Sequence, residues 1–155
     1  MMMDESLRDV PELTVDIHNA RGYTSWLSSL ENESNAQYKT VFTQVTDRKP
    51  GIFGLLGWET GILLEEIQQQ FAAGEKGKNI IKSILEKTFA SPRGWMRIDG
   101  TTNQTYSPSY LVSCNGNLDF RVEGQIEDTA EEREKFFMER PEGYSSGWKN
   151  TYLCS

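Results

Sequence analysis

The chain has 155 residues, of which 25% are charged and 37% hydrophobic, and its formal net charge is −7. That length predicts a single soluble domain, and the negative charge argues against nucleic acid, whose phosphates require a basic surface. Between Glu123 and Glu142, eight residues are acidic and three are basic. Residues 123–155 are therefore interpreted as an acidic, helical tail that is solvated rather than an interaction tail.

The first residues, MMMDESLRDVPEL, have no basic segment followed by an apolar one, so they do not read as a signal peptide as they stand. Three methionines leading straight into an acidic segment look like a start placed inside a longer reading frame. Cys114 and Cys154 lack metal-ligand spacing, and a single bridge between them is left open.

The first predicted elements are a strand and a helix. ARGYTSWL is β-branched and aromatic, which predicts a strand over about Gly22 to Trp26. Ser34 or Asn35 is expected to cap the following helix, and Pro50 to stop it. One face of that helix is expected to carry Tyr38, Val41, Phe42 and Val45.

The stretch IFGLLGWETGILLEEIQQQF, Ile52 to Phe71, predicts a second helix with three interior glycines. Each costs about 0.5–1 kcal/mol relative to alanine. Gly54, Gly57 and Gly61 are spaced to lie on one side, which indicates a close approach, either in the core or beside a ligand cleft. Gly57→Ala is accordingly expected to destabilise the full-length protein. A membrane span is disfavoured because the run also holds Glu59, Glu65 and Glu66.

This helix is also predicted to be amphipathic, with charges toward solvent. The stripe expected to face the core is Phe53, Leu56, Leu63, Ile67 and Phe71. The side expected to face away from it carries Glu59, Glu66, Gln69 and Gln70.

The rest of the chain predicts one more helix, three strands and a helical tail. KGKNIIKSILEKTF is expected to be a helix with apolar positions at Ile80, Ile81, Ile84, Leu85 and Phe89. Short strands are expected near Trp95 to Ile98, Ser109 to Ser113 and Leu118 to Val122, followed by a helix capped by Asp128 or Thr129. The fold class is α/β, and residues 1–155 are interpreted as one incomplete domain, because the single early strand lacks partners for a closed sheet.

No catalytic constellation is found in the sequence. His18 is the only histidine, and a surface histidine is a better reading of it than a catalytic one. There is no GxGxxG, P-loop or HExxH, and the adjacent Glu65 and Glu66 diverge on a helix as part of a solvated face. The chain is therefore interpreted as a non-enzyme with no cofactor and no metal.

Three segments together resemble the type 1 periplasmic binding proteins of the branched-chain amino-acid class. The second helix resembles the family pattern F-x-x-x-G-Y-[DE]-[AT], here Phe53 followed by Gly57, Trp58, Glu59 and Thr60. GYTSWLSSLENESNAQYKTVFTQV is similar to the family's strand and helix before it. FASPRGWMRIDGTTNQTYSPSYLVSCNGN is similar to its F-x-x-P-x-G-x-[VM]-x-[FI]-D and the strand that follows. The likeness runs from about Asp4 to Val122.

The resemblance implies two doubly wound lobes joined by hinge strands, with the ligand in the cleft between them. This chain would be only the C-terminal portion, a partial lobe with hinge crossings. Phe53 matches an aromatic position that borders the apolar part of the ligand. Trp58 stands where the family has tyrosine, and Trp26 matches an aromatic near the cleft mouth. None of these residues does chemistry.

The implied function is solute binding for an ABC transporter, with an amino acid or similar small polar solute as ligand, the transporter permease as partner and the periplasm as location. Two rivals are a free-standing α/β interaction domain that dimerises to complete its sheet, and an enzyme using His18 or the region of the glycine-containing helix. The isolated chain is expected to bind no amino acid tightly, and to self-associate through Phe53, Leu55, Leu56 and Trp58.

Overall fold

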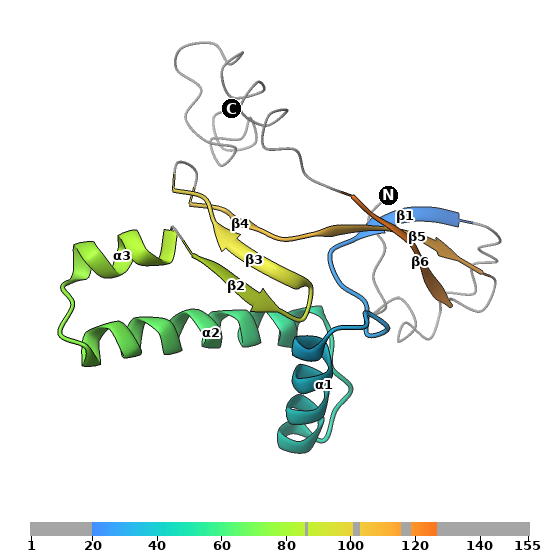
Figure 1. Ribbon diagram of the computed structural model, residues 1–155. Coiled ribbons are helices and arrows are strands. Elements are labelled where there is room, and N and C mark those ends of the chain that lie inside the picture. The colour runs from blue at the N-terminus through green and yellow to red at the C-terminus, as the bar shows by residue number, and fades with distance from the viewer. Residues whose placement is uncertain (1–19, 86, 101–102, 116–118, 127–155) are drawn as a thin grey trace, which may run out of the picture.

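The computed structural model describes residues 20–85, 87–100, 103–115 and 119–126 (Figure 1). The elements in order are β1 (Ala20–Thr24), α1 (Glu33–Thr46), α2 (Ile52–Ala72), α3 (Gly77–Leu85), β2 (Thr88–Ser91), β3 (Gly94–Ile98), β4 (Thr105–Tyr106), β5 (Ser109–Cys114) and β6 (Phe120–Ile126). The α/β class is confirmed. His18, Cys154 and the expected helix at Asp128 or Thr129 lie outside the described residues.

The strands form two antiparallel sheets, which Figure 1 shows on different sides of the structure. In the first sheet β5 lies between β1 and β6, and Ala20 pairs with Cys114. In the second sheet β3 lies between β2 and β4, with a tight turn that pairs Ser91 with Gly94. Only Ser107 and Pro108 separate β4 from β5, so the chain passes directly from one sheet to the other.

Helix α1 begins at Glu33, earlier than the predicted caps Ser34 and Asn35 indicate. Its N-cap is Asn32, whose side-chain oxygen accepts a hydrogen bond from the backbone N–H of Asn35 at 2.8 Å, which satisfies one of the free amide groups of the first turn. The helix ends before Pro50, because Asp47 adopts a left-handed conformation with φ 53° and bonds back to Thr43. The expected caps Ser34 and Asn35 therefore lie inside the helix, and Asn35 is buried.

Helix α2 has the predicted length, but the prediction of its buried face was wrong. Phe53, Leu56 and Phe71 are exposed, whereas Leu55, Glu59 and Glu66 are buried. Among the stripe residues, only Leu63 and Ile67 pack against the core. Two charged residues that were expected to face solvent, Glu59 and Glu66, therefore lie on the buried side of α2.

The glycines of α2 do not share one role, as the sequence had suggested. A Cβ added at Gly54 would lie 2.5 Å from Cε2 of Phe42 and 2.7 Å from the Tyr38 hydroxyl, so this glycine permits close packing of α1 on α2. A Cβ at Gly57 or Gly61 would meet nothing within 4 Å. In this chain the close approach is made at one of the three positions.

The segment after α2 divides differently from the prediction. Helix α3 stops at Leu85, and Phe89 belongs to β2, where it is buried with Ile80, Ile84 and Met96. Strand β2 was missed because Phe89 continues the four-residue helical spacing of Ile81 and Leu85, and short apolar runs fit both periods. A second core cluster lies under the β1–β5–β6 sheet, and a third joins Trp26, Tyr38 and Leu55 between α1 and α2.

Candidate functional site

The three aromatic residues singled out from the sequence lie near the start of α2, but in different environments. Phe53 is in the first turn and is 84% exposed. Trp58 is half-buried and packs on Tyr38, with ring centroids 5.6 Å apart. Trp26 is buried, with its ring centroid 5.9 Å from that of Tyr38. Tyr38 thus joins Trp26 to Trp58, and Phe53 alone of the three presents its ring to solvent.

Tyr38 also fixes where α2 begins. Its hydroxyl donates a hydrogen bond of 2.8 Å to the carbonyl of Gly51, which is the N-cap of α2. Burial raises the pKa of Tyr38 above its ordinary value, although the bond to Gly51 acts the other way. The neutral phenol is therefore the form that links α1 to the start of α2.

Asn35 holds the segment between β1 and α1 in place. Its side-chain oxygen accepts a 2.9 Å hydrogen bond from the indole N–H of Trp26, and its amide nitrogen donates to the carbonyl of Leu30 at 2.8 Å. Because Asn35 is fully buried, each of these bonds satisfies a polar group that water cannot reach. Trp26 is consequently held by a buried polar contact rather than presented at a surface.

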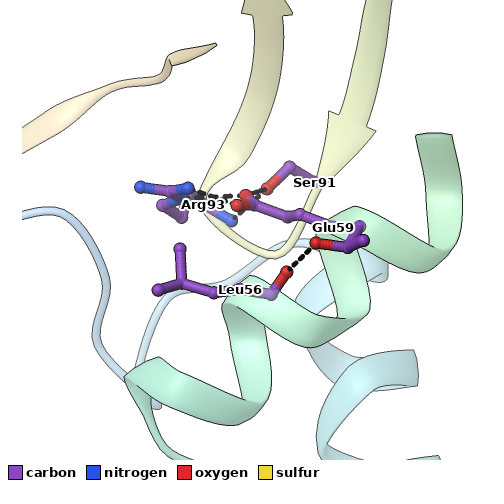
Figure 2. A network of polar contacts seen from close by, with 5 residues as sticks. Leu56, Glu59, Ser91 and Arg93 are labelled. Carbon is purple, nitrogen blue, oxygen red and sulfur yellow. Dashed lines mark hydrogen bonds and ion pairs between the residues drawn. The ribbon is translucent and has the colours of Figure 1, made fainter. Parts of the chain in front are cut away.

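A buried carboxylate on α2, that of Glu59, is the centre of a polar network that joins the helix to the turn after β2 (Figure 2). Glu59 Oε1 accepts hydrogen bonds from the Ser91 hydroxyl at 2.6 Å and from Arg93 Nε at 2.8 Å, and Glu59 Oε2 accepts from the terminal nitrogen of Arg93. The guanidinium thus binds both carboxylate oxygens, the geometry that suits this pair best. The side chains of Glu59 and Arg93 are both almost fully removed from solvent.

The turn that carries Arg93, residues 91–94, is held by two further elements. The amide of Asn32, at the start of α1, donates to the carbonyl of Pro92 at 3.1 Å. The hydroxyl of Tyr110, on β5 of the other sheet, donates to the carbonyl of Arg93 at 2.6 Å, and burial raises the pKa of Tyr110. This turn is therefore tied to α1, to α2 and to the β1–β5–β6 sheet.

A second carboxylate, Glu66, lies two turns farther along α2. It accepts hydrogen bonds from the ammonium group of Lys87 and from the amide of Gln70, the latter at 2.9 Å. These two bonds, that from Lys87 first, hold the pKa of Glu66 below its ordinary value of 4.5. Glu66 was expected on a solvated face with Glu65, and that prediction was wrong for Glu66.

The hydrogen bonds and ion pairs of this arrangement hold the helices and the two sheets together. Within the described ranges, every buried side-chain nitrogen or oxygen has a hydrogen-bond partner, and no three acidic, histidine or cysteine side chains gather as metal ligands. A depression of about 410 Å³ lies along α1, lined by Glu33, Ala36, Gln37, Thr40 and Val41. Trp26, Phe53 and Trp58 do not line it. No helix in the described part of the chain is long and apolar enough to span a membrane.

The sequence interpretation missed Glu59 and Arg93. These two residues are 34 positions apart in the sequence. Because an amphipathic helix usually turns its charged residues toward solvent, Glu59 was expected to be exposed. One local signal was present, since Arg93 stands in a Ser-Pro-Arg-Gly turn, but this signal does not identify Glu59 as its partner.

Comparison with known proteins finds solved structures with a similar fold but no matching family model. No protein-family model matches the chain, and no curated protein matches it. A solved solute-binding protein of an ABC transporter from R. palustris, in complex with benzoate, is 20% identical with a TM-score of 0.61, over 83% of this chain and 36% of that one. The chain therefore has part of the fold of ABC-transporter solute-binding proteins.

Other solved proteins with this solute-binding fold support the same conclusion. An ABC-type branched-chain amino acid transporter protein from Rhodopseudomonas palustris is 14% identical with a TM-score of 0.63, over 80% of this chain and 34% of that one. A Brucella ovis protein that binds leucine, isoleucine, valine, threonine and alanine is 13% identical with a TM-score of 0.54, over the same shares of the two chains. The chain thus spans about a third of the length of these solved proteins. The resemblance inferred from the sequence is confirmed at the level of the fold.

Proposed function

We propose that the chain is the C-terminal portion of a solute-binding protein that delivers a small molecule to an ABC-transporter permease outside the cytoplasm. The observation that carries this proposal is the similarity of fold over four-fifths of the chain to solved proteins of that kind. These solved proteins bind rather than transform their ligands, which supports a non-enzymatic role. The two buried carboxylates of α2, Glu59 and Glu66, are both paired with cations, which agrees with that role.

The proposed ligand is a small carboxylic acid with an apolar part, of which an amino acid is one example. Solved proteins with this fold are described with benzoate, with 4-hydroxybenzoate and as leucine-binding. All of these ligands combine one carboxylate with an apolar portion. Phe53 supports the same class from this chain, because its ring is exposed at the start of α2 and could cover the apolar portion.

The three aromatic residues take different roles in this proposal. Phe53 contacts the ligand. Trp58 packs on Tyr38 and so supports the first turns of α2. Trp26 is buried and bonded to Asn35, so it positions the neighbouring segment instead of contacting the ligand. Arg93 is already paired with Glu59, so it is not assigned to the carboxylate of the ligand.

The test uses the chain alone and a chimera in which residues 20–126 replace the matching third of the R. palustris benzoate-binding protein. The chain alone is expected to bind neither leucine nor benzoate tightly, since a one-sided cleft cannot enclose a ligand. The chimera is expected to bind a ligand of the proposed class by calorimetry, and Phe53→Ala to weaken binding about tenfold.

Val45→Ala is the matched control, because Val45 is as exposed as Phe53 but lies on α1. A chimera that binds equally well with Phe53→Ala would contradict the role of Phe53. Sub-micromolar binding by the isolated chain would contradict the proposal that the chain supplies only one side of the site.

A further inference from the structure

Four large apolar side chains and two glycines form one exposed face of α2, called the outer face here. Its apolar and glycine members are Phe53, Leu56, Gly57, Gly61, Leu64 and Phe71, and the exposed, uncharged Thr60 and Gln68 lie among them. Their positions recur every three or four residues, so they fall on one side of the helix. Phe53 is the most exposed of the four, and Leu56, Leu64 and Phe71 are 48%, 59% and 60% exposed.

The outer face has almost no charge to make it soluble. Helix α2 contains no lysine or arginine, and its acidic residues are Glu59, Glu65 and Glu66. Two of these are buried and paired on the opposite side, which leaves Glu65. A helix that has one side packed and a second, apolar side exposed is typical of the interior of a larger fold rather than of a surface.

The two glycines indicate how close a covering element would come. Glycine in a helix exposed to water weakens the helix and gains nothing there. Gly57 and Gly61 nevertheless stand in the middle of the outer face, and a Cβ on either would point into open space. Between Leu56 and Leu64 they form a notch into which a packed element can approach the helix backbone.

We propose that the outer face of α2, apart from Phe53 at its N-terminal end, is covered by the remainder of the same solute-binding lobe, which packs into the Gly57–Gly61 notch and makes α2 a central layer. The inference rests on the proposed function. The argument for this occupant is length: the solved proteins with this fold are about three times as long as the stretch that matches this chain. On the opposite side α2 already packs on α3, and Glu59 joins it to the turn between β2 and β3 (Figure 1), so the outer face is where further chain can add.

The first experiment measures self-association of the isolated chain by sedimentation velocity across a concentration series. An uncovered apolar face is expected to give associates whose size grows with concentration. Combined Leu56→Lys and Leu64→Lys should leave a monomer with an unchanged circular dichroism spectrum. Val45→Lys and Ile81→Lys, at exposed apolar positions on α1 and α3, are matched controls and should associate as the wild type does. Leu55 cannot contribute, because it is fully buried.

Two outcomes of this experiment overturn the proposal. A wild-type chain that stays monomeric at every concentration shows that the outer face needs no cover. A single closed dimer that the two lysines abolish shows that the occupant is a second copy of this chain.

The second experiment follows Gly57→Ala in the isolated chain and in the chimera described above, by urea unfolding. In the isolated chain the position is open, so alanine should raise the unfolding midpoint by about 0.3–0.5 M through helix propensity. In the chimera the covering element reaches the notch, so the same change should lower the midpoint. A midpoint raised in both proteins overturns the proposal. The chimera could fail to bind a ligand while Gly57→Ala still raises the unfolding midpoint of the isolated chain and lowers that of the chimera. That result would count against the proposed function and not against the covering of the outer face.

Discussion

Helix α2 has two long faces. Its buried face carries two carboxylates and its exposed face carries large apolar side chains, whereas a surface helix would have its charges on the exposed face. The face toward the turn of residues 91–94 holds the carboxylates Glu59 and Glu66, both buried and both paired with a cation. The opposite face holds exposed leucine and phenylalanine side chains. The difference teaches that hydrophobicity alone does not report which side of this helix is inside, since specific polar contacts help to fix the inner side together with Leu55, Leu63 and Ile67.

The largest expected effect is on the inner side, at the pair that is buried on both partners. Arg93→Met leaves the Glu59 carboxylate buried without its cation, and should lower the free energy of unfolding by ~3–5 kcal/mol. Urea unfolding at neutral pH measures it. The double variant Glu59→Leu with Arg93→Met is the control, and should lose much less because no unpaired charge remains. An equal loss of unfolding free energy in both variants would mean that the packing of the two side chains, and not their charges, provides the stabilisation.

Neighbouring leucines give the next test of the two faces. Leu55 is fully buried between α1 and α2, whereas Leu56 is on the outer face. In the isolated chain Leu55→Ala should cost about 2–5 kcal/mol, because it leaves a cavity. Leu56→Ala should change the free energy of unfolding by less than about 0.5 kcal/mol. Similar losses for the two variants, measured by thermal and urea unfolding, would show that the outer face is already covered in this chain.

A smaller effect is expected at the glycine that α1 approaches. Gly54→Ala would place a methyl group against the Phe42 ring and the buried hydroxyl of Tyr38, and should destabilise by ~1–3 kcal/mol. Near-ultraviolet circular dichroism should also change, because Tyr38 packs on Trp26 and Trp58. A Gly54→Ala variant as stable as Gly57→Ala would mean that Phe42 turns aside freely.

The smallest effect concerns Glu66, whose partner Lys87 is half-exposed, unlike Arg93. The bond from Lys87 lowers the pKa of Glu66 in the folded chain. The stabilisation is therefore complete above the ordinary value of 4.5 and is lost as the pH falls through the lower folded-state value. Lys87→Met should change stability little at neutral pH and should reduce the loss between neutral pH and acid below 4.5. An unchanged acid dependence of the urea midpoint would show that Glu66 is not its source.

The sequence predicted the elements whose causes are local. Helix α2 was found within a residue of its bounds because its apolar run is long, and β5 because it lies between turn signals. Strand β2 and the contacts of Glu59 were missed for a different reason. They depend on residues that meet only after the turn at Pro92 folds back on α2, and no periodicity of α2 encodes the position of Arg93. The ligand role of Phe53, Trp58 and Trp26 stays a prediction.

The pairing of β1 with β5 has a consequence for the order of assembly. The register joins Ala20 to Cys114 and Thr24 to Tyr110, so this sheet closes a loop that contains every helix described here. Such distant contacts form late, because the entropy of closing the loop is lost before any pairing is gained. The β2–β3 hairpin closes across two residues, Pro92 and Arg93, and can form beside α2 as soon as both have been synthesised. During translation β1 therefore waits with an unpaired edge until β5 leaves the ribosome, which is the interval in which the nascent chain is most exposed to pairing with a wrong strand.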